Sequence, residues 1–81
     1  MDYKNLDLTE LLYKMHESKS EIEFHKTMAS FAYMRAVHFP TNTKQYRKYI
    51  NRHVSHARSV KKYENIHALL LHEYTRRKNH D

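Results

Sequence analysis

Apolar side chains recur at helical spacing along most of the chain. Near the N-terminus, the positions i, i+3, i+4 and i+7 on one expected helix face are Leu8, Leu11, Leu12 and Met15. Asp7 or Thr9 can cap the first turn of this helix through a side-chain oxygen. Ser18 and Ser20 each stand three residues before a glutamate, and this doubled capping-box pattern predicts that a second helix starts there.

The second helix is expected from about Glu21 to His38. Its apolar stripe consists of Phe24, Met28, Phe31 and Ala32. Phe39 and Pro40 should end it, because the residue before a proline is disfavoured in helical geometry. The polar residues 41–43 then provide a loop and a cap for the next helix.

Two more periodic stretches follow, with no glycine or proline between them. The first has Tyr46, Ile50, Val54 and Ala57, with His53 on the same side. The second has Tyr63, Ile66, Leu70 and Tyr74. Residues 44–76 therefore form either one long helix or two helices joined near Ser59 or Asn65. The whole pattern predicts an all-α fold: a small antiparallel bundle of three or four helices in a single domain, 1–81, with a basic tail at about 76–81.

The composition narrows the possible functions. The 81 residues include no glycine, one proline and no cysteine. The chain therefore lacks phosphate-binding glycine loops, nucleophile elbows, disulfides and thiolate zinc sites. A chain of this length buries only about 60% of its unfolded surface, which leaves little core for a catalytic cleft. These features favour a non-enzymatic subunit or adaptor that acts through its helix faces.

The net charge of +6 is unevenly distributed along the sequence. Residues 1–40 hold five Lys/Arg and six Asp/Glu, whereas residues 41–81 hold ten Lys/Arg and three Asp/Glu. A strongly basic C-terminal half points to an acidic partner, which can be nucleic acid, anionic lipid or an acidic protein. The longest apolar run, Ala68–Leu71, is far too short to span a membrane. The acidic N-terminal region also argues against a cleavable mitochondrial presequence.

Three segments form a layout found in a known family. Leu12-Tyr13-Lys14 lies in the first expected helix, residues 33–39 contain an aromatic, a basic residue and Phe39, and Ala57-Arg58 follows in the third. Over residues 8–62 this resembles the LYR-motif family of small, basic, three-helix mitochondrial proteins. Lys14 departs from the family's arginine, whose planar guanidinium makes hydrogen bonds that a lysine cannot copy.

The resemblance implies an adaptor that binds mitochondrial acyl carrier protein and serves as a subunit or assembly factor of a larger complex. By position, the partner-binding residues would be Leu12, Tyr13, Lys14, Arg35, Phe39 and Lys44. The acyl chain would lie in a tunnel lined by Met28, Ala29, Ala32, Ala36 and Ala57. The only cofactor implied is the carrier's own acyl-4′-phosphopantetheine, and the implied location is the mitochondrial matrix or the matrix side of the inner membrane.

Two other interpretations rest on the residues alone. Tyr46, Tyr49 and Tyr63 alternate with Lys and Arg, a pattern suited to a nucleic-acid-binding protein that combines phosphate neutralisation with base stacking. A structural subunit wedged between other proteins would need only the amphipathic stripes. His53 and His56 share a helix face, but two histidines are only half of a zinc site, so neither a metal nor a catalytic residue is expected.

Overall fold

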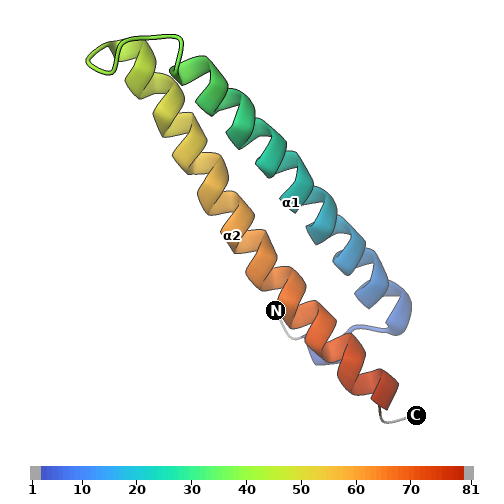
Figure 1. The fold of residues 1–81 in the computed structure, drawn as a ribbon. Helices are drawn as coiled ribbons and strands as arrows, with labels where there is room; N and C mark the ends of the chain where they lie inside the picture. Colours follow the sequence, from blue (N-terminus) through green and yellow to red (C-terminus); the bar gives the residue numbers. More distant parts are fainter. Residues whose placement is uncertain (1–2, 80–81) are drawn as a thin grey trace.

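The computed structural model describes residues 3–79, which form two long antiparallel helices lying side by side (Figure 1). A short 3-10 helix, η1 (Tyr3–Asn5), precedes α1 (Leu8–Ala36), and α2 (Lys44–Asn79) runs back along α1. The molecule measures 57 × 16 × 16 Å and has a radius of gyration of 17.3 Å. A compact domain of this length would have a radius of about 12 Å. The protein is therefore an elongated helical hairpin.

The all-α prediction is confirmed, but the described residues form two long helices instead of three or four. The expected helix start at Ser18 and Ser20 is wrong, because α1 continues through both. Ser18 is buried; its hydroxyl donates a hydrogen bond to the Met15 carbonyl at 3.0 Å and lies 3.1 Å from His67 Nδ1. A serine satisfied in this way can remain inside a helix. The second half of the chain is one unbroken helix.

Side-chain caps stabilise the first turns of both long helices, as predicted, and the loop between them needs no glycine. The Asp7 carboxylate caps α1 by accepting a hydrogen bond from the Glu10 N–H at 2.8 Å. The Thr43 hydroxyl does the same for α2, accepting from the Tyr46 N–H at 3.2 Å. Residues 37–43 connect the helices, and no described residue has a positive φ. A loop with such dihedral angles needs no glycine, which agrees with the composition.

The two helices meet along one narrow line of residues, which we call the seam. On α1 the seam residues are Leu11, Met15, Ser18, Ile22, His25, Ala29, Ala32 and Ala36. On α2 they are Tyr46, Tyr49, His53, His56, Val60, Tyr63, His67 and Leu70. All are buried or half-buried, and their spacings alternate between three and four residues. This heptad pattern is typical of a left-handed coiled coil.

Several of the predicted apolar stripes are wrong in detail. The residues expected in the core but exposed in the structure are Leu8, Leu12, Phe24, Phe31, Val54 and Ala57. The stripe predicted near the C-terminus, which contains Leu70, is buried or half-buried as expected. A helix with only one neighbour buries a strip narrower than the wide apolar face that a bundle helix buries. Large apolar side chains are consequently left on the outside of the hairpin.

Candidate interaction surface

The half of the hairpin that ends at the loop is strongly basic. Residues 24–63, which we call the loop half, contain nine Lys/Arg and no Asp or Glu. Contacts across the seam join His25 to His56 and Phe39 to Tyr49, so the two chain segments of the loop half lie side by side (Figure 1). The remaining residues hold six Lys/Arg and nine Asp/Glu. Folding therefore produces a rod with one strongly basic half.

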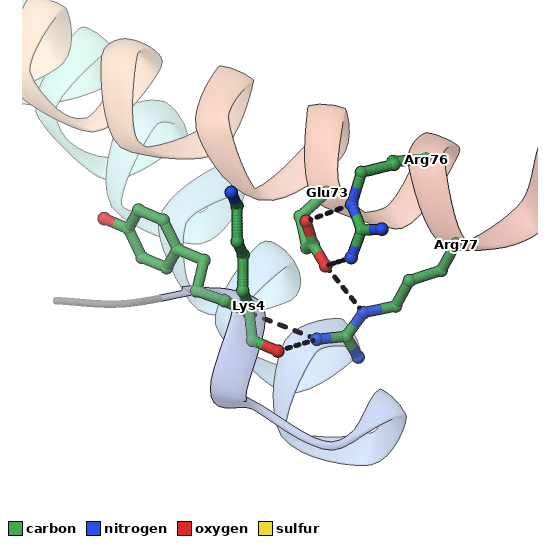
Figure 2. A network of polar contacts seen from close by, with 5 residues as sticks. Lys4, Glu73, Arg76 and Arg77 are labelled. Atoms are coloured by element: carbon green, nitrogen blue, oxygen red, sulfur yellow. Dashed lines mark hydrogen bonds and ion pairs between the residues drawn. The ribbon is translucent and has the colours of Figure 1, made fainter.

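At the opposite end of the rod, basic residues are neutralised by a buried carboxylate (Figure 2). Glu73 accepts hydrogen bonds from Arg76 Nη2 at 2.6 Å and from Arg76 Nε at 2.9 Å, and a third from Arg77 Nε at 2.9 Å. The hydrogen bonds from Arg76 and then Arg77 lower the pKa of Glu73 from 4.5 to about 2, against the opposing effect of burial. Of the expected basic tail at about 76–81, residues 76–79 lie in α2, and residues 80–81 lie outside the described part.

Arg77 also connects α2 to the start of the chain. Arg77 Nη2 donates hydrogen bonds to the carbonyl oxygens of Tyr3 at 3.2 Å and Lys4 at 3.1 Å. Figure 2 shows Arg77 lying between Glu73 and the η1 backbone. The Glu73 carboxylate thus orients a guanidinium that holds η1 against α2.

Acid should weaken this cluster over a defined pH range. Because the pKa of Glu73 is lower in the folded chain, its carboxylate stabilises the fold above pH 4.5, and the contribution is lost as the pH falls from 4.5 to about 2. We expect Glu73→Gln to lower the urea midpoint of unfolding near neutral pH, and we expect this difference to vanish near pH 2. Circular dichroism across a pH series measures it. Glu64→Gln, at an exposed site of the same helix, should change the midpoint little at any pH. A Glu73→Gln deficit that persists unchanged in acid would contradict the assignment.

The solvent-facing side of α2 carries four of the nine cations of the loop half in one row. This row, which we call the outer α2 stripe, contains Lys44, Arg47, Val54, Arg58 and Lys61. All five side chains are exposed, and the row extends over about 25 Å at 1.5 Å per residue. Tyr33 on α1 and Val37 directly after its last residue are both exposed, and the Tyr33 ring lies 5.5 Å from the His53 ring of α2. Cations and apolar side chains are therefore both available on the loop half.

The residues predicted to bind a partner fall into two separate groups. Tyr13 and Leu12 are exposed near the start of α1, where Lys14 is half-buried. Arg35 and Lys44 are exposed near the loop. Phe39, also near the loop, is half-buried, and its ring stacks on Tyr49 with 5.8 Å between centroids. Tyr13 and Arg35 are separated by roughly 30 Å along α1, so the hairpin does not bring the two groups together.

The residues predicted to line an acyl tunnel are also divided. Ala29, Ala32 and Ala36 are buried in the seam, where their small side chains allow α2 to approach closely. Met28 is half-buried beside them. Ala57 is exposed on α2 and does not join the group.

The histidines make contacts across the seam that the sequence reasoning missed. His25 Nδ1 lies 2.8 Å from His56 Nδ1, and His53 Nδ1 lies 2.9 Å from the Ala29 carbonyl oxygen. One imidazole must donate and the other accept in the first contact. Their signal in the sequence is the heptad spacing: His25, His53 and His56 occupy seam positions when histidine is counted together with the apolar residues. Over residues 3–79 there is no group of three or more His, Asp or Glu side chains that could hold a metal ion.

The tyrosines proposed to stack on nucleic-acid bases are used inside the hairpin. Tyr46, Tyr49 and Tyr63 are half-buried seam residues. Tyr49 stacks on Phe39, and Tyr63 stacks on His25 with 5.8 Å between ring centroids. These rings are therefore less available for base stacking than their spacing in the sequence indicates.

Fold and surface together define a class: an all-helical, two-helix hairpin with a polar seam and one basic half. No protein-family model, curated protein or solved structure matches the chain. Across the part of the chain that the structure describes, neither helix has a stretch apolar enough to cross a membrane.

Proposed function

We propose that the protein is a non-enzymatic adaptor that binds an acidic protein through the loop half of its hairpin. The observation that carries this proposal is the set of nine Lys/Arg without a single Asp or Glu in residues 24–63. A surface of one charge sign attracts a partner of the opposite sign and speeds its association. The pairing of Arg76 and Arg77 with Glu73 leaves the loop half as the main source of positive potential.

The apolar side chains among the cations support a protein partner. Tyr33, Val37 and Val54 are exposed on the loop half. Protein interfaces typically bury aromatic and apolar side chains in the centre and place charges at the rim. A nucleic-acid backbone would pair with the cations and would leave these apolar groups in water.

Within this class, the LYR-like segments favour an acyl carrier protein. Arg35, Phe39 and Lys44 lie at the basic end, where an acidic carrier would dock. In this proposal the acyl chain enters the seam at Ala29, Ala32 and Ala36, where the side chains between the two helices are smallest. Entry of the chain would move α2 away from α1. The proposed role is to bridge the carrier to a larger complex, without catalysis by the hairpin itself.

Reversing the charge of two arginines on the outer α2 stripe should weaken binding of the carrier protein. We expect Arg47→Glu combined with Arg58→Glu to weaken binding of acyl carrier protein at least about tenfold, because two attractive contacts become repulsive. Titration calorimetry measures the dissociation constant for the apo, holo and acylated carrier. The acylated form should bind most tightly, since each buried CH₂ contributes about 0.8 kcal/mol.

A second charge-reversed variant serves as the matched control. Lys19→Glu combined with Lys78→Glu makes the same change in net charge at exposed sites outside the loop half. Its affinity for the carrier should remain within about twofold of the parent. Equal losses from both double variants would show that only net charge matters and would overturn the proposed surface.

Nucleic acid is the second candidate partner, supported by the outer α2 stripe, which carries four cations and no acid. In that case a short DNA duplex would bind with an affinity that falls linearly with salt on logarithmic axes. Tight duplex binding with no measurable affinity for any form of the carrier would replace the adaptor proposal with this one.

A further inference from the structure

A second row of side chains lies on the opposite flank of the hairpin from Tyr33. This row, which we call the α1 stripe, consists of Glu17, Glu21, Phe24, Met28, Phe31 and Arg35; Glu21 and Met28 are half-buried and the other four are exposed. The Glu21 carboxylate also lies 3.4 Å from His25 Nε2. Its spacings alternate between four and three residues, so the six side chains form one continuous line along α1. Phe24 and Phe31 are 54% and 57% exposed, which is unusual for two phenylalanines on one face of a small protein.

The order of chemical types along the α1 stripe is self-complementary. Acidic residues lie at one end, apolar residues in the middle and Arg35 at the other end. A two-fold axis at Met28 places Glu21 and Arg35 at equal distances, seven residues on either side. In an antiparallel pair of α1 helices, each Glu21 therefore faces an Arg35, and each Phe24 lies one residue from the position opposite Phe31. Such reciprocal pairing is the defining property of a symmetric dimer interface.

A groove beside the apolar centre can receive the partner's aromatic ring. It has a volume of about 240 Å³ and is lined by Met28, Phe31, Ala32 and Arg52, among others. With the axis at Met28, the Phe24 ring of a second copy lies over this groove.

The exposed area of the chain agrees with a missing partner of this size. The hairpin exposes 6383 Å², whereas a compact protein of this mass would expose about 5,200 Å². The excess is comparable to the roughly 800 Å² per partner that a standard interface buries. With the axis at Met28 the two basic loop halves lie beside each other, so the Glu21–Arg35 pairs act against the repulsion between the remaining cations.

We propose that two copies of this chain associate through their α1 stripes as an antiparallel dimer with its two-fold axis at Met28. The resulting assembly is a four-helix arrangement that covers Phe24 and Phe31 of both copies. Two reciprocal ion pairs between Glu21 and Arg35 set the orientation. The outer α2 stripes lie on the side of α2 that faces away from the seam and stay outside this interface, so this inference holds whether or not the proposed partner is correct.

Charge exchange across the interface tests the dimer and its orientation together. Sedimentation equilibrium should give a dissociation constant below about 100 µM for the parent chain. Glu21→Arg alone and Arg35→Glu alone should each raise it at least about tenfold, because each creates two like-charge contacts. An equimolar mixture of the two variants should return to within about threefold of the parent, since both contacts between unlike variants are again opposite in sign.

Recovery of dimerisation in the mixture distinguishes the loss of an interface contact from a failure to fold. A variant that simply fails to fold would not recover on mixing. Glu23→Arg makes the same charge change at an exposed position outside the α1 stripe, about 100° around the helix from Phe24. This variant should leave the dissociation constant of the dimer unchanged. A parent chain that stays monomeric at 100 µM would overturn the proposal. So would singly substituted variants that dimerise normally, or a mixture that shows no recovery.

Discussion

Replacing Leu70 with alanine should cost about 2–5 kcal/mol of unfolding free energy, the range for removing a buried leucine side chain. Leu70 is only 1% exposed, and the other fully buried large side chain of the described residues is Leu11, at 0%. A domain of this size has a total stability of only about 4–12 kcal/mol. Leu70→Ala should therefore leave a large fraction of the chain unfolded at moderate urea concentrations.

The two neighbouring leucines provide a control within the same helical turn. Leu69 is 56% exposed and Leu71 is 46% exposed, so truncating either to alanine should change the stability by less than about 0.5 kcal/mol. Urea unfolding followed by circular dichroism measures all three variants at one fixed protein concentration, since self-association would shift the apparent stability. Equal effects at the three positions would show that α2 does not pack on α1 through the seam described above.

The contact between His25 and His56 should appear as a coupling energy of about 1–2 kcal/mol in a double-mutant cycle. His25→Leu or His56→Leu alone removes one member of a pair with Nδ1 atoms 2.8 Å apart. The remaining half-buried imidazole then loses its hydrogen-bond partner, which is costly. The double substitution removes both polar groups, so its unfolding free energy should equal or exceed that of the parent.

A second double-mutant cycle, between His25 and His72, serves as the control for the His25–His56 contact. His72 is exposed on α2 and lies outside the seam. A cycle between His25→Leu and His72→Leu should be additive within about 0.5 kcal/mol, because the two residues share no partner. A coupling as large as that of the His25–His56 cycle would contradict a direct contact.

Much of the helical structure follows from local sequence. The cap at Asp7, the break around Pro40 and the cap at Thr43 each depend on residues within four positions of one another. Local hydrogen bonding and dihedral preference decide such features, so they can be read from the chain. The false break at Ser18 shows the limit of this reading. Its hydroxyl is satisfied partly by His67, which lies 49 residues away in the sequence.

The interaction surfaces were less predictable from the sequence. Several faces of each helix carry apolar residues, and Phe24 and Phe31 are more hydrophobic than the alanines that pack in the seam. The run of residues 24–63 without Asp or Glu is present in the sequence, and the hairpin places its α1 part, with Arg35, alongside its α2 part, with Arg58. The sequence did not predict the cluster of Glu73, Arg76 and Arg77. The burial of Glu73 depends on the packing of distant segments, which local residue spacing does not show.

The amino-acid sequence was sufficient to predict that the chain is helical, that a helix ends near Pro40 in a loop without glycine, and that the charge is strongly positive. These properties depend on backbone preferences and composition, which act over a few residues. The faces that meet and the histidines that pair become known only from the folded hairpin. Those properties depend on the packing of helices far apart in the sequence, where small alanines allow close approach and bulky phenylalanines remain outside.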